Sequence, residues 1–141
     1  MSYATKIAMI ARFSEAEVIA LTDRGDLGVI DDAVLAGALE EADAEIDPYL
    51  APRYKLPLAN VPRILTGFAC DIARYRLCGT GGVTETEEIR NRYKDAVKFL
   101  ESVANGKIGL GLDAANNVAP SANTVQFSAP GARVFDRGTR G

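Results

Sequence analysis

Apolar residues recur at intervals of three or four along the first three quarters of the chain, which is the spacing of an amphipathic α-helix. The first two helices that this pattern predicts are short. Thr5 can cap the first one, and Ser14 with Glu17 forms a capping box that opens a second helix running to about Thr22. In a capping box, each of the two side chains accepts a hydrogen bond from the backbone N–H of the other residue.

A third, longer helix is predicted to begin at Asp31 or Asp32, either of which can cap it. It should end near Ala51, because Pro52 disfavours helical geometry in the residue before it. The apolar positions that keep a helical spacing along it are Leu35, Leu39, Ala42, Ile46, Tyr49 and Leu50.

The fourth predicted helix has Pro62 in its first turn and runs to Gly79. Apolar residues cover more than half of its circumference, so we expect it to be the central helix, packed by several neighbours. Arg76 falls within the apolar arc, where an unpaired charge would be costly. Its guanidinium either extends to the surface or pairs at an interhelix or subunit contact, with an acid of the third helix as the expected partner.

A fifth helix is predicted from the capping box of Thr84 with Glu87 to a stop at Asn105–Gly106. Its apolar face consists of Ile89, Tyr93, Ala96, Val97, Leu100 and Val103. The sequence therefore predicts an all-α fold, a compact bundle of about five helices. We place the helical domain at residues 1–106 and an extended C-terminal tail at residues 107–141.

The tail differs from the helical domain in charge and in composition. The domain holds 12 basic and 17 acidic residues, whereas the tail holds 4 basic and 2 acidic residues and is rich in Gly, Ala, Asn and Ser. Residues 124–127 and 133–135 are each compatible with a short β segment. A segment this poor in core residues needs a partner surface to become ordered. The apolar side chains that we expect to anchor it are Leu110, Leu112, Phe127, Val134 and Phe135.

Composition limits the classes of protein to consider. A hydrophobic fraction of 48% in 141 residues indicates one globular domain, and a net charge of −3 disfavours a protein that coats nucleic acid. No apolar run approaches the roughly 20 residues that span a membrane. The first residues lack the features of a secretory signal, so they are interpreted as the beginning of a folded cytosolic domain.

Candidate catalytic and metal-binding chemistry is sparse. The chain has no histidine, and Cys70 and Cys78 are too far apart along one helix for a disulfide, so both are expected to be reduced and buried. Residues 23–34 resemble an EF-hand loop, but the carboxylates that calcium requires are missing. The glycines of residues 79–82 are not followed by the Lys-Ser/Thr of a phosphate loop. We therefore predict no catalytic residues, no metal site and no cofactor.

Charged residues are segregated along the domain, with acids concentrated before Pro52 and bases after it. This segregation describes either two solvated helix faces or an acidic face of one subunit that meets a basic face of the next. The residues that we single out as candidate intersubunit contacts are Glu40, Glu41, Asp43, Asp47, Arg74, Arg76, Arg90 and Arg92.

Several segments together resemble the Mu-like prophage head–tail connector family. They are Leu21–Arg24, Ala44–Leu58, Ala69–Leu77 and Gly106–Leu112, with a weaker similarity at Arg133–Arg137. The resemblance implies a self-assembling ring, expected to be dodecameric, beneath the portal protein in the neck of a virion. The ring would contact a tail-side stopper or terminator protein and surround DNA without reading its sequence. It also implies assembly in the host cytoplasm, no membrane association and no catalytic residues.

An alternative is a small prophage-encoded helical module that binds DNA or regulates expression. In that case Arg90, Arg92, Lys94 and Lys98 of the fifth predicted helix would supply phosphate contacts. The net negative charge of the chain speaks against this alternative. An enzyme is the third hypothesis, and the lack of histidine and of a nucleophile motif disfavours it.

Overall fold

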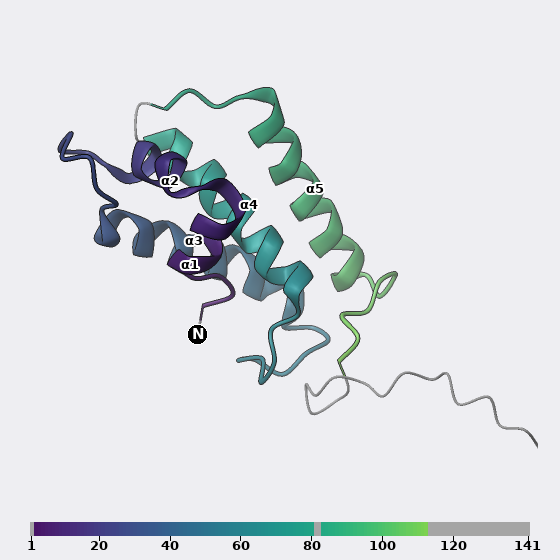
Figure 1. Ribbon diagram of the computed structural model, residues 1–141. Helices are drawn as coiled ribbons and strands as arrows, with labels where there is room; N and C mark the ends of the chain where they lie inside the picture. Colours follow the sequence, from purple (N-terminus) through teal and green to yellow (C-terminus); the bar gives the residue numbers. More distant parts are fainter. Residues whose placement is uncertain (1, 81–82, 113–141) are drawn as a thin grey trace, which may run out of the picture.

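The computed structural model of the chain describes residues 2–80 and 83–112, and these residues form five helices (Figure 1). The helices are α1 (Lys6–Phe13), α2 (Glu15–Thr22), α3 (Asp32–Leu50), α4 (Arg63–Thr80) and α5 (Glu87–Ala104). The predicted all-α fold and the number of its helices are confirmed. In Figure 1, the three long helices lie side by side, and the two short N-terminal helices cover α4.

Side-chain caps explain where α1 and α2 begin. The Thr5 hydroxyl accepts a hydrogen bond from the backbone N–H of Ala8 at 3.2 Å, and the Ser14 hydroxyl accepts one from that of Glu17 at 3.4 Å. The second half of the predicted capping box does not form. The Ser14 N–H donates to the Ile10 carbonyl instead, because α1 leads directly into α2, and the Glu17 carboxylate is used by Arg74.

The central position predicted for α4 is confirmed, since α4 contacts each of the other four helices. The buried residues of α4 include Leu65, Ile72 and Leu77, each at most 1% exposed. They pack with fully buried side chains from the neighbouring helices and from the α3–α4 connection, among them Met9, Val18, Leu35, Ile46, Leu58 and Leu100. The helices that surround α4 therefore share one continuous core.

The start of α5 differs from the prediction. Thr86, and not Thr84, is the N-cap residue, and its hydroxyl accepts a hydrogen bond from the Ile89 N–H at 3.3 Å. This register places Glu87 and Glu88 in the first turn, where carboxylates interact favourably with the positive end of the helix dipole. It also places Ile89, 4% exposed, in the core at the beginning of the helix.

The two cysteines are free and buried, as predicted. No helix within the described part of the chain is long and apolar enough to cross a membrane. The most prominent irregular feature is the connection between α2 and α3, residues 23–31, which projects beyond the ends of the helices at the left of Figure 1.

Candidate interaction surfaces

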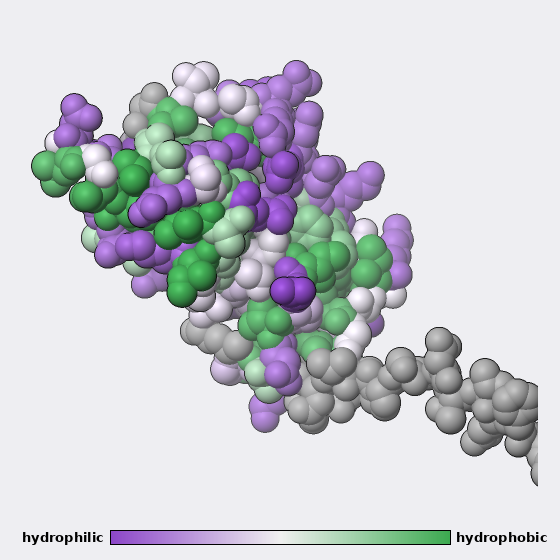
Figure 2. Space-filling model, in the orientation of Figure 1, coloured by the Kyte–Doolittle hydropathy of each residue, from purple (hydrophilic) through white to green (hydrophobic). Residues whose placement is uncertain are grey.

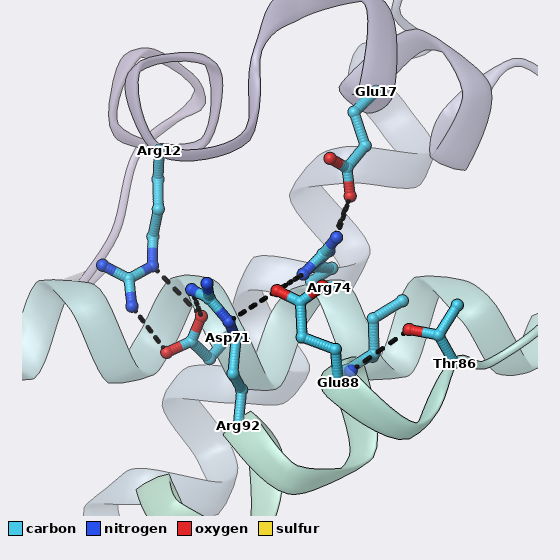
Figure 3. Close-up of polar contacts among 8 residues, drawn as sticks. Arg12, Glu17, Asp71, Arg74, Thr86, Glu88 and Arg92 are labelled. Atoms are coloured by element: carbon cyan, nitrogen blue, oxygen red, sulfur yellow. Dashed lines mark hydrogen bonds and ion pairs between the residues drawn. The ribbon is translucent and has the colours of Figure 1, made fainter.

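A buried carboxylate on α4 joins three helices (Figure 3). Asp71 is 3% exposed, and its two oxygens accept hydrogen bonds from Nε and Nη2 of Arg12 on α1, at 3.1 and 2.8 Å. Arg92 of α5 approaches the same carboxylate from the other side, with Nη1 at 3.9 Å from Oδ1. The hydrogen bond to Asp71 raises the pKa of the Arg12 guanidinium, so this cation stays charged beside the carboxylate.

Arg74, one turn further along α4, is paired in the same way. Its side chain is 11% exposed, and its Nη2 lies 2.5 Å from the Glu17 carboxylate of α2. Glu88 of α5 lies on its other side, at 3.7 Å from Nη1. The guanidinium also stands 4.6 Å from the centre of the Phe13 ring, a cation–π geometry. Arg74 therefore connects α4 to α1, α2 and α5.

Arg76 fulfils both alternatives that the sequence left open, since its side chain is 43% exposed and is also paired with an acid of α3. Its Nη2 donates to the Glu45 carboxylate at 2.7 Å, and the other oxygen of Glu45 accepts a hydrogen bond from the Tyr93 hydroxyl at 2.6 Å. The Tyr93 ring stacks on Tyr75 with 4.1 Å between centroids. Burial, with the hydrogen bond to Glu45, raises the pKa of Tyr93 to about 12. Within this group of residues, Arg76 serves to hold α3, α4 and α5 together.

The four candidate contact arginines therefore all have carboxylate partners within the chain. Besides Arg74 and Arg76, Arg90 bonds to Glu85 at 2.6 Å and Arg92 bonds to Glu88 at 2.9 Å. An acid on another subunit could recruit any of them only by competing with a partner that is already in place. That these residues make intersubunit contacts stays a prediction.

The candidate acids of α3 divide into two pairs. Asp43 accepts a hydrogen bond from the Tyr3 N–H at 2.9 Å, and Asp47 accepts one from the Tyr3 hydroxyl. Burial raises the pKa of Asp43 and, together with the Asp47 contact, that of Tyr3. These two acids hold the N-terminal segment. Glu40 and Glu41 are exposed and form no ion pair within the described residues. Glu41 lies near Arg76 and, after Glu45, contributes to the raised pKa of that guanidinium.

Of the candidate tail anchors, Leu110 and Leu112 are half-buried and pack against the core of their own chain. The Leu110 N–H donates to the Tyr54 hydroxyl at 2.9 Å, and Arg53 donates from one nitrogen to the carbonyls of Val103 and Ile108. The start of the predicted tail is thus held by the α3–α4 connection. The other three candidates, Phe127, Val134 and Phe135, lie outside the described residues.

The projecting α2–α3 loop (residues 23–31) presents two large apolar side chains to solvent. Leu27 is 76% exposed and Val29 is 56% exposed, and Figure 2 shows hydrophobic surface at the tip of this loop. Both oxygens of Asp23 accept backbone N–H groups, from residues 25 and 27 at 3.2 and 3.1 Å and from Gly28 at 2.7 Å. These bonds, above all that from Leu27, lower the pKa of Asp23. The EF-hand-like pattern therefore corresponds to a turn whose first acid is engaged by the backbone.

Sequence reasoning did not single out this loop as a surface feature. The signal for it was present, since Leu27 and Val29 flank a glycine in a segment with no helical or strand periodicity. Gly28 adopts a φ of +72°, a conformation that glycine takes without strain, and so lets the chain reverse at the tip.

A cleft of about 330 Å³ lies between α1 and the first two turns of α4. Its walls are small or apolar, and two arginines, Arg12 and Arg63, line it. Gly67 belongs to its α4 side, and a Cβ added there would approach the Arg12 guanidinium to 3.3 Å. The cleft is therefore a depression open to solvent, lined by small residues beside positive charge.

The described residues offer no clear catalytic centre. No group of three or more His, Cys, Asp or Glu residues among them could hold a metal ion. Cys70 also lines the cleft, but burial raises the pKa of its thiol to about 11, so it is not a thiolate nucleophile at neutral pH. The features that remain are surfaces: the apolar loop, the arginine-lined cleft and the charged faces of α3 and α5.

Comparison with known proteins gives a consistent family relationship. The family model described as "Bacteriophage Mu, Gp36" matches residues 3–129. The chain is 35% identical over 137 residues to the Mu-like prophage FluMu protein gp36 of Haemophilus influenzae. This alignment covers 97% of this chain and 94% of that protein. It is 34% identical over 142 residues to gene product J of Escherichia phage Mu, covering 100% of this chain and 99% of that protein.

Proposed function

The chain belongs to the bacteriophage Mu Gp36 family, and from this membership we propose that it is a structural head–tail connector subunit of a tailed phage or phage-like particle. In this role, copies of the chain form a ring, expected to be dodecameric, beneath the portal protein. The ring joins the DNA-filled head to a tail-side stopper or terminator protein and encloses the channel through which DNA leaves. The subunit performs no catalysis.

The structural observation that supports this proposal most is that charged side chains pair within the subunit, whereas several large apolar side chains are exposed. Among the described residues, Arg12 of α1 and Arg74 and Arg76 of α4 form ion pairs that hold helices together. In contrast, Ile7, Leu27 and Val29 are each more than half exposed. Adjacent apolar side chains on a protein surface are typical of sites that contact other proteins, and Leu27 and Val29 are neighbours in one loop. This distribution favours a protein that functions through its surfaces, as an assembly subunit does.

The same distribution disfavours the DNA-binding alternative. Arg90 and Arg92 on α5 are neutralised by Glu85 and Glu88 of their own chain. Lys94 and Lys98 have no such partner among the described residues, but two lysines are a small basic surface on a chain of net charge −3. Phosphate contacts made by the isolated subunit would therefore be few.

The proposal is tested in the phage or prophage that encodes the chain. Deleting the gene should yield DNA-filled heads and separate tails, and supplying the full chain in trans should restore joined particles, both scored by electron microscopy. A catalytic or regulatory role would instead reduce the amounts of heads, tails or DNA. Normal joined particles in the deletion strain would overturn the proposal.

A second experiment examines the purified full chain. Native mass spectrometry over a series of concentrations, and mixing with portal-bearing heads, should reveal subunit association or binding to the heads. Fluorescence anisotropy with a DNA duplex at low and high salt serves as the comparison. A chain that stays monomeric, ignores the heads and binds duplex DNA in a salt-sensitive manner would support the regulatory alternative.

A further inference from the structure

We propose that the α2–α3 loop of one copy docks into the α1–α4 cleft of the next copy, with Leu27 and Val29 inserted between the two helices. The proposal rests on the proposed function, because it supplies the contact that repeats around the ring. It assigns different surfaces of the chain to the two sides of that contact.

The loop has the properties of a preformed apolar projection. Its two large side chains are exposed, yet the loop is held by hydrogen bonds at three points. Asp23 accepts the N–H groups of the turn, the buried Thr22 hydroxyl accepts the Asp31 N–H at 3.2 Å, and Arg24 donates to the Thr80 hydroxyl at 3.1 Å. A loop that is already ordered loses little conformational entropy when it docks, so more of the contact energy is available for binding.

The cleft is complementary to this projection in the size and polarity of its walls. Ala8 and Ala11 of α1 face Gly67 of α4 across it, so no large side chain from these positions fills the space. The volume of about 330 Å³ is open to solvent and bordered by these small residues and by the two arginines, and it can receive aliphatic side chains that would otherwise lie in water.

Charge is complementary as well. The loop contains Asp23, Asp26 and Asp31 against a single base, Arg24, whereas the cleft is lined by two arginines and no acid. Arg12 is already bonded to Asp71. Among the described residues, Arg63 has no anionic partner and Asp26 has no cationic partner. Bringing Asp26 near Arg63 would pair two charges that the single subunit leaves alone.

The two surfaces lie at opposite ends of α4, so they cannot meet within one copy. The Arg24–Thr80 hydrogen bond fixes the loop at the last residue of α4, whereas Arg63 and Gly67 place the cleft in its first two turns. The helical rise from Gly67 to Thr80 is roughly 20 Å. A contact between different patches on successive copies is heterologous, and such contacts close into a ring when the rotation per copy allows it.

The expected affinity of the isolated contact is low. One loop in one cleft buries less surface than the roughly 800 Å² per partner of a stable protein–protein interface. We therefore expect reversible association of the free subunit, and rings that persist where the portal holds many copies in place.

The first test uses two complementary variants of the full chain. Leu27→Ser with Val29→Ser removes the projection, and Ala11→Glu blocks the cleft with a bulky, charged side chain. Each variant alone should weaken self-association by at least about tenfold in sedimentation equilibrium. An equimolar mixture should form dimers but no larger species, because each variant retains one intact surface. Ile64→Ser is the matched control, since it removes an aliphatic side chain that is 51% exposed and lies outside both surfaces.

The second test exchanges the charges. Asp26→Arg and Arg63→Asp should each weaken association, and the double variant should recover most of the wild-type affinity. Circular dichroism of each variant ensures that a loss reflects the contact and not unfolding. The inference would be overturned if the projection and cleft variants self-associated as strongly as the wild type. It would also be overturned if the double charge-exchange variant did not recover affinity.

The outcomes also separate this inference from the proposed function. If the wild type joins heads to tails and the projection and cleft variants do so equally well, the inference is wrong and the proposed function stands. If Leu27→Ser with Val29→Ser abolishes binding to portal-bearing heads but leaves self-association intact, the loop docks on the portal and the inference is wrong. A wild type that neither self-associates nor binds heads refutes both.

Discussion

Removing the Arg12 side chain should destabilise the fold more than neutralising the buried acid to which it is bonded. In Arg12→Ala, the Asp71 carboxylate, which is 3% exposed in the wild type, loses both of its close hydrogen bonds, of 3.1 and 2.8 Å. Its remaining cation is Arg92, 3.9 Å away. The variant therefore leaves a buried charge with one distant partner, which is among the more costly changes that a single substitution makes.

The magnitude follows from the geometry of the pair. Removing one partner of a buried ion pair costs about 3–5 kcal/mol. Two features reduce this cost here: the Arg12 side chain is 36% exposed, and Arg92 can move closer to the carboxylate. We expect Arg12→Ala to lower the free energy of unfolding by about 2–3 kcal/mol. Asp71→Asn should cost only about 1–2 kcal/mol, because both arginines it releases can reach water and the amide keeps an acceptor oxygen.

The assay is urea unfolding followed by far-UV circular dichroism, at two protein concentrations so that association does not distort the comparison. The double variant should lose less stability than the sum of the single losses, with a coupling energy of about 1–2 kcal/mol. Lys6→Ala, which removes an exposed pair with Asp32, is the control and should change stability by less than about 0.5 kcal/mol. Equal effects of Arg12→Ala and Lys6→Ala, or strict additivity in the cycle, would refute the reasoning.

Three further outcomes are expected. Thr86→Ala should cost about 1 kcal/mol in urea unfolding, because it removes the hydroxyl that caps α5, whereas Thr84→Ala should have almost no effect; the reverse order would restore Thr84 as the cap. Tyr93 has a folded-state pKa of about 12 against an ordinary value of 10.0, so its contribution to stability is complete below pH 10 and is lost as the pH rises towards 12. Tyr93→Phe should therefore flatten the stability curve in that range, and an unchanged curve would contradict the raised pKa of Tyr93, which burial and the hydrogen bond to Glu45 cause. Cys70 should react with iodoacetamide at pH 8 only slowly in the folded chain and rapidly in urea, because burial raises the pKa of its thiol to about 11. Mass spectrometry measures both rates, and equal rates would show that the thiol is accessible.

The helices could be predicted from the sequence because local signals and the apolar pattern agree along most of them. The wide apolar arc of α4 is a property of its own residues, and it was sufficient to predict a central position. The start of α5 was less determined, since Thr84 and Thr86 both precede acidic residues and both can cap a helix. The burial of Ile89 distinguishes the two registers, and burial depends on the other helices.

The interaction surfaces were less predictable, because they depend on which charges are used inside the subunit. Arg12 and Asp71 are 59 positions apart, and Arg74 and Glu17 are 57 apart, so no local pattern connects them. The segregation of acids and bases could therefore be seen in the sequence. The ion pairs that Arg74 and Arg92 form within the subunit could not. The exposure of Leu27 and Val29 was not predicted for a different reason. A short loop has no periodicity from which the exposure of a side chain can be inferred.

The hydrogen bonds of Arg53 and Tyr54 determine how the fold would respond to a force on its C-terminal segment. Arg53 joins the carbonyl of Val103, in the last turn of α5, to that of Ile108, and Tyr54 holds Leu110 two residues further on. A pull on the C-terminal segment would therefore reach the α3–α4 connection before it could unwind α5 from its end. Such a force would then be borne by two segments of the chain in parallel, and not by the end of a single helix.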